Sequence, residues 1–303
     1  MTIRLDMLRA ASRAKALLGD SAELAANFIT KQLNPDGGFR GRSSQSDLYY
    51  TVFGIESLLA LGAEFPKERI QNYLLKFHDG SSLDLVHLAC LARCRADLSQ
   101  TQDARLKMQD SRLGAGIARN IERCHCSDGA YNISAEFQNG SAYCCFLALG
   151  AYQDLNIEMQ NTAAIVDCVK SLQTPDGAYS NDRIIQIGST TATAAALAVL
   201  HYLGQPIDRR STNWLLSRIH PQGGFVATAI PGWECTADLL STATALHALS
   251  LAEVPIDSIR KQCLNFLNTL WSDEGSFRSS STDDTLDCEY AYYGLLALGH
   301  LSK

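Results

Sequence analysis

Three carboxylates within five residues form the most concentrated polar feature of the sequence: Asp283, Asp284 and Asp287, in the segment Asp-Asp-Thr-Leu-Asp. On a helix, Asp283 and Asp287 would share one face and could bind a hard cation such as Mg²⁺. Alternatively, a carboxyl group that its neighbours and an apolar wall keep protonated could act as a general acid. Helix capping is a third role, because carboxylates are favoured at helix N-termini and an apolar stretch begins at Cys288. The sequence leaves these three roles open.

A second polar group, Cys235 and Asp238, precedes another apolar stretch in the same way. Aligned on the leucines that follow, these two residues correspond to Asp284 and Asp287. One hypothesis is a mixed site in which Cys235, Asp238 and Asp287 bind Zn²⁺. The other is that Cys235 is a small buried apolar residue.

Arginines and aromatic residues supply further chemistry. Arg42 and Arg278 lie in polar segments, where a guanidinium can pair bidentately with a phosphate group or can be solvated. Aromatic faces suit an apolar chain and can stabilise a carbocation, although they can equally fill a core. The aromatic candidates are Tyr49, Tyr50, Tyr143, Trp233 and Tyr290.

An internal repeat must position these residues. A turn of the form Asp-Gly-x-aromatic, a polar loop and an Ala/Leu-rich stretch recur along the chain, with some copies degenerate. The first glycines of the turns lie 43 to 52 residues apart, and they are Gly37, Gly80, Gly129, Gly177, Gly223 and Gly275. Each of the six units is long enough for two helices and a loop.

The helix before each turn is predicted to be amphipathic and the helix after it apolar nearly all round, which places the second helix inside. Four amphipathic helices are predicted over Glu23–Leu33, Lys67–Phe77, Asn161–Leu172 and Ile256–Leu270. The apolar helices are predicted over Tyr50–Leu61, Leu83–Arg93, Ser141–Tyr152, Thr190–Leu203, Leu239–Leu251 and Cys288–Leu301. A linear solenoid would need polar capping repeats, which neither end supplies. We therefore expect an all-α fold, an α6/α6 barrel (double-layered α/α toroid), as a single domain over residues 1–303.

Composition excludes several classes of protein. The chain has 303 residues, of which 46% are hydrophobic and 19% charged, and its formal net charge is −6. Nucleic-acid binding is not expected, because no basic run appears. No apolar stretch reaches 18 residues and the N-terminus lacks a signal-peptide pattern, so the ten cysteines are expected to be reduced in a cytoplasmic protein.

The repeats resemble those of the protein prenyltransferase β-subunit and squalene/terpene cyclase superfamily over almost the full length. Residues 37–62, GGFRGRSSQSDLYYTVFGIESLLALG, are especially similar to a repeat of the Rab geranylgeranyltransferase β subunit. Residues 136–145, EFQNGSAYCC, resemble another repeat of that subunit. This resemblance implies a barrel with an apolar central funnel that holds an isoprenoid chain.

The sequence departs from the family pattern at the positions that bind zinc and diphosphate in the family. The family's zinc site uses an Asp, a Cys two residues later and a His, but Tyr50 stands in the most similar His slot and no apolar helix starts with Asp-x-Cys. The family's diphosphate-binding His corresponds to Gln138, whereas Arg42 and Arg278 match the loops that hold the diphosphate. Asp283-Asp284-Thr285 resembles the end of the acid motif Asp-x-Asp-Asp-Thr of class II cyclases. Residues 283–287 also match the Mg²⁺-binding pattern Asp-Asp-x-x-Asp of class I terpene synthases.

The resemblance therefore implies an enzyme that acts on an isoprenoid diphosphate by carbocation chemistry, through cyclisation or transfer to a small acceptor. Asp283, Asp284 and Asp287 would be the catalytic acids or Mg²⁺ ligands. One alternative is a prenyltransferase β-like subunit that works with a helical partner subunit and an unconventional zinc site. The other is a toroid that binds a lipid or peptide without catalysis.

Overall fold

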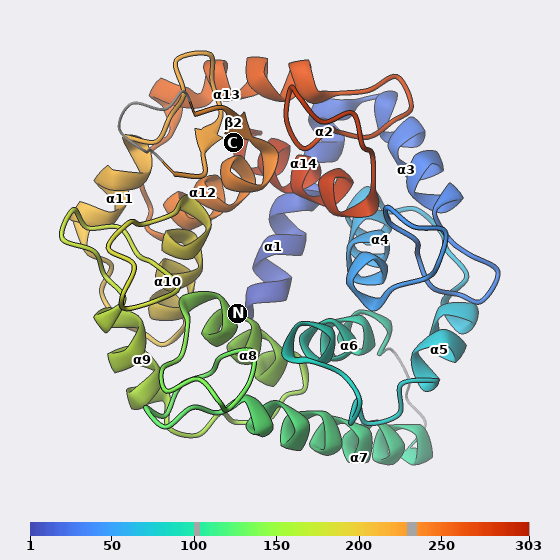
Figure 1. Cartoon of the computed structure of the whole chain (residues 1–303). Coiled ribbons are helices and arrows are strands. Elements are labelled where there is room, and N and C mark those ends of the chain that lie inside the picture. The colour runs from blue at the N-terminus through green and yellow to red at the C-terminus, as the bar shows by residue number, and fades with distance from the viewer. Residues whose placement is uncertain (100–103, 229–234, 303) are drawn as a thin grey trace.

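The chain forms two concentric rings of helices (Figure 1) in the computed structural model, which describes residues 1–99, 104–228 and 235–302. Within those residues, the inner ring consists of α4 (Leu48–Leu61), α6 (Leu85–Leu98), α8 (Ala142–Asp154), α10 (Thr190–Tyr202), α12 (Leu239–Leu251) and α14 (Cys288–Leu301). The outer ring consists of α3 (Ser21–Lys31), α5 (Lys67–Leu75), α7 (Ala104–Ile121), α9 (Thr162–Ser171), α11 (Arg209–Leu216) and α13 (Asp257–Leu270). The ring closes where α14 packs against α4, which confirms the predicted α/α toroid.

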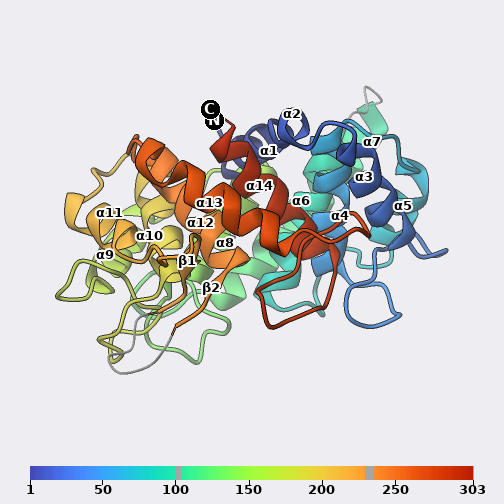
Figure 2. The ribbon, with the colours of Figure 1, turned by 90° about the horizontal axis from the view of Figure 1, so that it is seen from above.

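Each inner helix begins at a polar residue in extended conformation. The side chains of these residues accept a backbone N–H of the first helical turn, and they are Asp47, Asp84, Ser141, Ser189, Asp238 and Asp287. Such caps satisfy a donor that the helix itself leaves unpaired. Because the caps all lie at the start of the inner helices, the loops that precede them gather at one end of the barrel, as Figure 2 shows.

The repeated turn fastens each loop to the inner helix that follows. The backbone N–H groups of Phe39, Tyr179 and Phe225 donate to threonine hydroxyls of α4, α10 and α12, each at 2.9 Å. Gly37 adopts a φ of +97°, and a Cβ there would lie 2.1 Å from the backbone oxygen of Arg69. The glycine is therefore required both by its backbone conformation and by the close approach of the outer helix.

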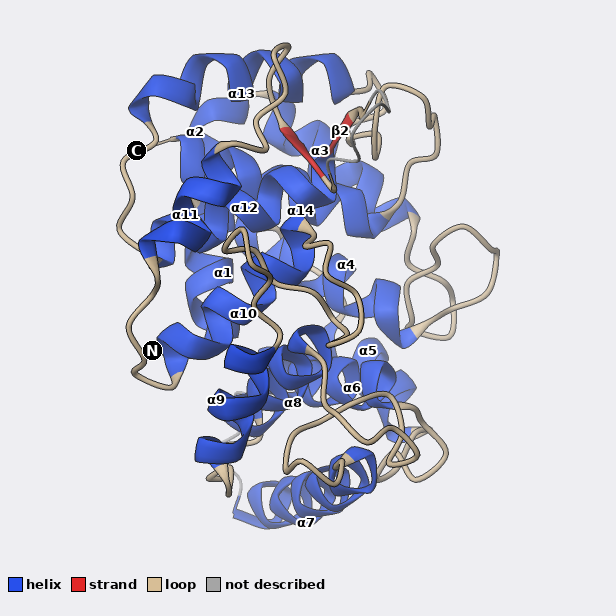
Figure 3. Cartoon of the chain, turned by 60° about the vertical axis from the view of Figure 1, so that its left-hand side comes forward, coloured by secondary structure: helices blue, strands red, loops and turns tan. Residues whose placement is uncertain are grey.

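Besides isolated β-bridges at the repeated turns, the described residues form one small β-ribbon (Figure 3). Strand β1 (Phe225–Val226) pairs antiparallel with β2 (Ala237–Asp238), immediately before α12. A short 3₁₀ helix, η1 (Glu122–Cys124), follows α7. Neither element was predicted from the repeat pattern.

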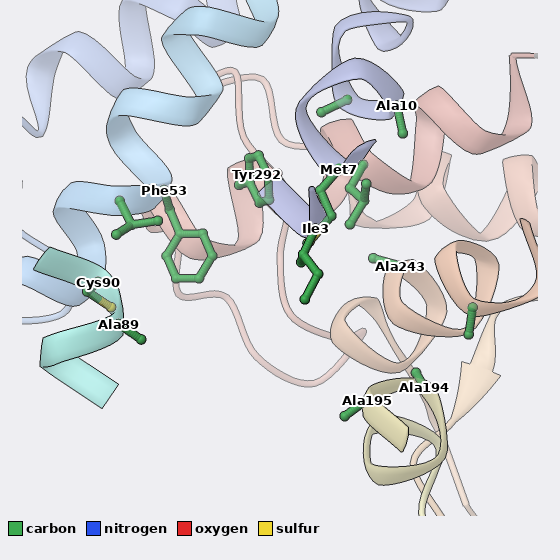
Figure 4. Packing of buried hydrophobic residues seen from close by; sticks show 14 of the residues in the cluster. Ile3, Met7, Ala10, Phe53, Ala89, Cys90, Ala194, Ala195, Ala243 and Tyr292 are labelled. Carbon is green, nitrogen blue, oxygen red and sulfur yellow. The ribbon is translucent and has the colours of Figure 1, made fainter. Parts of the chain in front are cut away.

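The N-terminal helix α1 (Ile3–Ser12) lies inside the ring, and α2 (Ala14–Leu18) leads from it to the outer layer (Figures 1 and 2). Ile3 and Met7 are buried and point towards the barrel interior, where Phe53 and Tyr292 also lie (Figure 4). Both termini lie at the end of the barrel opposite the loops. Helix α1 therefore closes one end of the barrel, an arrangement that the sequence pattern did not predict.

Arg4 anchors α1 to two inner helices. Its guanidinium lies 2.8 Å from Asp97 Oδ1 and 2.8 Å from Asp154 Oδ1, and both carboxylate side chains are buried. Burial raises the pKa of Asp97 and of Asp154, while Arg4 opposes that rise. The closed end of the barrel is thus held by charged groups that depend on one another.

Among the described residues, none of the helices combines the length and the apolar character needed to span a bilayer.

Candidate functional site

A central cavity of about 300 Å³ lies among the inner helices. On one side, Tyr49, Tyr143, Phe146 and Tyr293 form an aromatic wall. On the other side, α10 contributes only small side chains, and these are Thr191, Ala192, Ala194, Ala195 and Ala198. Met7 of α1 also lines the cavity. The small side chains of α10 therefore leave a space next to the aromatic wall. Such a cavity is expected of a pocket for an apolar ligand.

A second hollow of about 90 Å³ adjoins the cavity and shares its aromatic wall. Its lining also includes Arg4 and Arg93, which belong to the closed end of the barrel. Arg93 Nη2 lies 2.6 Å from Glu56 Oε2, whose side chain is fully buried, and 3.3 Å from the Tyr292 hydroxyl. The interior is therefore apolar around the main cavity and charged towards α1.

Four of the predicted aromatic residues lie in or near the mouth of the cavity: Tyr49, Tyr50, Tyr143 and Tyr290. Tyr49 and Tyr143 line it, whereas Tyr50 packs edge-on against Tyr49 with ring centroids 5.4 Å apart. Tyr290 lies beneath the guanidinium of Arg42, 5.9 Å from the ring centroid. Trp233 lies outside the described residues.

The acid that adjoins the cavity is Glu289, in the first turn of α14, and the sequence analysis did not single it out. Glu289 is 8% exposed, and its Oε1 accepts a hydrogen bond of 2.6 Å from the hydroxyl of Tyr49. Burial raises the pKa of the Glu289 carboxyl, and the nearby Asp287 reinforces this rise. The Tyr49 hydrogen bond and the charge of Arg42 oppose it. A carboxyl group thus lies directly behind a cavity-lining tyrosine, in surroundings that favour its protonated form.

One signal in the sequence could have identified Glu289. It is the only acidic residue within the otherwise apolar helix CEYAYYGLLALGHL. A buried acid on an apolar face requires a partner, and such a group is a candidate functional residue.

The predicted acid cluster does not form a helical face. Helix α14 begins at Cys288, so Asp283 and Asp284 lie in the preceding loop. Asp283 accepts the Ser279 hydroxyl at 2.8 Å and the Thr285 backbone N–H at 2.9 Å, and these bonds lower its pKa to about 2. This loop conformation is possible because Asp283 replaces a helical hydrogen bond with a local turn.

The other two acids of the cluster point to different partners. The side chain of Asp284 is 93% exposed and lies 3.0 Å from Arg278. Asp287 is buried as the cap of α14, where it accepts the Tyr290 N–H at 3.0 Å and lies 3.5 Å from Arg42 Nε. Helix capping, the third role considered above, therefore describes Asp287.

The predicted metal ligands are also engaged elsewhere. Asp238 caps α12 by accepting the Ser241 N–H at 2.7 Å, and Cys235 is half-buried ahead of β2. No three His, Cys, Asp or Glu side chains form a group able to hold a metal ion in the described part of the chain. The residues as arranged do not fit the Mg²⁺ site on Asp283 and Asp287 or the Zn²⁺ site with Cys235. Both cofactors stay predictions.

The predicted phosphate-binding residues lie in loops. Arg42 is 52% exposed at the mouth, beside Asp287 and Tyr290. Gln138 is exposed, and its backbone oxygen accepts the Ser127 hydroxyl at 3.0 Å. Of the candidates, Arg42 is the cation that the structure brings next to the Glu289–Tyr49 pair, since it also opposes the rise in the Glu289 pKa.

Comparison with known proteins identifies the family. The model of the prenyltransferase alpha-alpha toroid domain matches residues 4–160, 145–213 and 205–303. No curated protein matches the chain.

Solved structures show the same fold at low identity. The type II terpene cyclase MstE from Scytonema in complex with geranylgeranyl dihydroxybenzoate (substrate) is 15% identical, with a TM-score of 0.62, and the match covers 95% of this chain and 97% of that one. Its complex with merosterolic acid A (product) gives a TM-score of 0.61 at 15% identity, with the same coverage. A protein from Actinoplanes is 13% identical with a TM-score of 0.58, and the match covers 93% of this chain and 98% of that one.

Proposed function

The chain belongs to the prenyltransferase alpha-alpha toroid domain family, and on that premise we propose that its central cavity binds an isoprenoid chain and starts carbocation chemistry by protonation. The apolar, aromatic-walled cavity supports the first part of this proposal. The fold shared with a type II terpene cyclase, over nearly the whole of both chains, is consistent with the second part.

The observation that carries the proposal is the pair formed by Glu289 and Tyr49 at the edge of the cavity. In the proposed step, a carbon of an alkene takes the carboxyl proton of Glu289. The C=C π electrons form the new C–H bond, the adjacent carbon becomes cationic, and Glu289 is left as a carboxylate. A raised pKa suits this role, because the acid must hold its proton at neutral pH and release it to a weak base.

The cavity walls would then guide the cation. Tyr49, Tyr143 and Tyr293 present aromatic rings, whose negative faces stabilise positive charge. Attack by further alkenes of the same chain forms rings. Loss of a proton from the final carbocation to solvent then leaves an uncharged hydrocarbon skeleton that still carries the diphosphate. Glu289 recovers its proton from solvent, so the net reaction is an isomerisation.

Arg42 is suited to the head group of the substrate. Its guanidinium is half-exposed at the mouth and uses Nε towards Asp287, so its outer edge is available to an anion such as a diphosphate. In a protonation-initiated reaction the head group is retained, because no bond to it needs to break. Binding of the head group by Arg42 agrees with its position near Glu289 and outside the apolar cavity.

The experiment uses the whole chain with geranyl, farnesyl and geranylgeranyl diphosphate, each with Mg²⁺ or with EDTA. We expect a cyclic product that retains its diphosphate, formed equally well in EDTA and at least about 10²-fold more slowly in Glu289→Gln. The matched control is Glu274→Gln, at an exposed position in the turn before α14. Mg²⁺-dependent release of pyrophosphate that survives in Glu289→Gln would contradict the proposal. Tight binding of the substrate without turnover would favour the non-catalytic toroid.

A further inference from the structure

His247 of α12 brings a polar side chain to the wall of the central cavity. The residue lines the cavity, yet it is only 6% exposed. Its Nε2 atom is buried, and among the described residues no donor or acceptor bonds to it. A buried ring nitrogen without a partner destabilises a folded chain. Such an atom beside a cavity therefore indicates a hydrogen bond to something that the cavity holds.

His300 of α14 fixes the orientation of the His247 ring. Nδ1 of His247 lies 3.1 Å from Nε2 of His300, and both residues are buried. One of these two nitrogens carries the shared proton, so Nε2 of His247 is an acceptor in one arrangement and a donor in the other. The bond holds one edge of the ring against α14 and leaves the other edge, with Nε2, for another partner.

The two histidines lie far from the acid, towards the closed end of the barrel. Glu289 and His300 are eleven positions apart on α14, which corresponds to about 16 Å along the helix axis. Met7 of α1, the helix that closes this end, lines the same cavity as His247. A chain that enters at the loop end and passes Glu289 would therefore bring its far end to His247.

The wall around His247 offers an apolar chain few other polar contacts. The residues of α12 that line the cavity are Leu240, Thr244 and His247. The Thr244 hydroxyl already donates to the Leu240 carbonyl at 2.8 Å. A single polar group in an otherwise apolar part of a pocket fixes the orientation of a ligand and provides specificity.

The electrostatic surroundings favour an uncharged partner for His247. Burial lowers the pKa of His247 to about 4, the charge of Asp6 opposes this shift, and Arg93 adds to it. The imidazole is therefore neutral near neutral pH and offers no counter-charge to an anion. Among neutral oxygen groups, a hydroxyl both donates and accepts, so it can pair with Nε2 in either tautomer, whereas a carbonyl or ether oxygen only accepts.

We propose that His247 is a specificity-determining residue that binds a hydroxyl group at the far end of the isoprenoid chain. The substrate would then carry a polar head group at the mouth of the cavity and a hydroxyl at the closed end. This inference rests on the proposed function for its ligand and names the class of that ligand: an isoprenoid with a hydroxylated tail.

The test measures binding by isothermal titration calorimetry in the Glu289→Gln chain, where turnover is slow. The probes are geranyl, farnesyl and geranylgeranyl diphosphate, each paired with an analogue that carries a hydroxyl on its terminal methyl carbon. For the chain length that reaches His247, the hydroxylated analogue should bind about tenfold or more tightly than the unmodified diphosphate. Adding His247→Leu should remove this preference. The unmodified diphosphate should still bind at least as tightly, because the buried polar atom is gone.

Two further variants separate recognition from a structural role. His247→Gln keeps both a donor and an acceptor and should retain part of the preference. The matched control is His201→Leu, at an exposed position of α10, which should keep all of it.

Equal binding within all three pairs of probes would overturn the proposal, as would a preference that persists in His247→Leu. Loss of all binding in His247→Leu would assign the residue a structural role and would also overturn it. Turnover by the natural chain is measured separately. A preference that depends on His247 without turnover would remove the proposed chemistry and leave the hydroxyl site, whereas turnover without any preference would remove the hydroxyl site alone.

Discussion

Glu289 and Tyr49 meet at the edge of the cavity although 240 residues separate them in the sequence. Tyr49 lies in the first turn of α4 and Glu289 in the first turn of α14, and closure of the ring brings the two helices together. Burial favours the protonated form of Glu289, whereas Asp283 is held ionised by local hydrogen bonds. The environment of each carboxyl, more than its place in a motif, therefore decides which one can donate a proton.

The first prediction concerns pH. Burial raises the pKa of Glu289, and the proposed step needs its protonated form, so turnover should be constant below that pKa and fall as pH rises through it. Glu289→Gln should lower turnover by about 10²- to 10⁴-fold and remove this dependence. Rates of product formation across a pH series measure both effects, and an unchanged profile in Glu289→Gln would contradict the assignment.

The second prediction separates Tyr49 from Glu289. The Tyr49 hydroxyl stabilises the ionised carboxylate, so Tyr49→Phe should raise the pKa of Glu289 further. The fall in turnover should then begin at a higher pH than in the natural chain. Tyr50→Phe is the matched control, because Tyr50 packs on Tyr49 with no hydrogen bond to Glu289 among the described contacts. A profile that does not move in Tyr49→Phe would show that the pair is not coupled.

At the scale of the element, the helices that line the cavity could be predicted and the helix that closes it could not. The inner helices are apolar nearly all round, and each follows a turn that recurs every 43 to 52 residues, so the repeat predicts their position in the inner ring. Helix α1, IRLDMLRAAS, carries two arginines and an aspartate and stands outside the repeat. Its burial depends on Asp97 and Asp154, distant partners that no local pattern reveals.

The same limit applies to the candidate site. The aromatic wall could be predicted, because Tyr49 and Tyr143 begin inner helices. The predicted helix start at Cys288 is confirmed, with Asp287 as its cap, but the hypothesis that Asp283 and Asp287 share a helical face is wrong, because Asp283 and Asp284 lie in the preceding loop. Which side chain of a helix start faces the cavity depends on packing across the ring, and sequence spacing alone does not specify it.

The third prediction tests the anchor of α1. Arg4→Ala removes the cation that is ion-paired with Asp97 and Asp154, leaving these buried carboxylates only the charge of Arg93. It should lower the free energy of unfolding by about 3–5 kcal/mol near neutral pH. Both carboxyls have raised pKa values in the folded chain, so the folded state binds more protons and the loss should shrink as pH falls. Urea unfolding at several pH values measures this. Arg9→Ala, at an exposed position of the same helix, is the control, and equal losses in both variants would contradict the anchor.

The fourth prediction tests how the turn packs on the inner helix. A Cβ on Gly54 of α4 would lie 2.4 Å from Phe39 Cδ1, so Gly54→Ala should lower the free energy of unfolding by about 1–3 kcal/mol. Gly150→Ala on α8 is matched, because its nearest atom would be 3.8 Å away. That variant should be neutral or stabilising by up to about 1 kcal/mol, since alanine favours the helix. Thermal unfolding of both compares them, and a stable Gly54→Ala would show that Phe39 can move aside.

For the whole molecule, the two ends of the barrel have different characters. One end is closed by α1 and a network of buried charges, and the other carries the loops and the half-exposed Arg42. An isoprenoid chain would therefore enter from the loop end and extend towards Met7. The acid lies at the loop end too, in the first turn of α14, so the part of the chain that reaches Tyr49 and Glu289 is the part expected to be protonated.

The fifth prediction tests the central claim that the chemistry begins with a proton from Glu289. The whole chain is incubated with geranylgeranyl diphosphate in D₂O, and the product is analysed by mass spectrometry. If protonation starts the reaction, the product carries deuterium on carbon and retains its diphosphate, and Glu289→Gln forms it at least about 10²-fold more slowly. A product without deuterium, formed together with free pyrophosphate, would contradict the account and favour ionisation of the diphosphate.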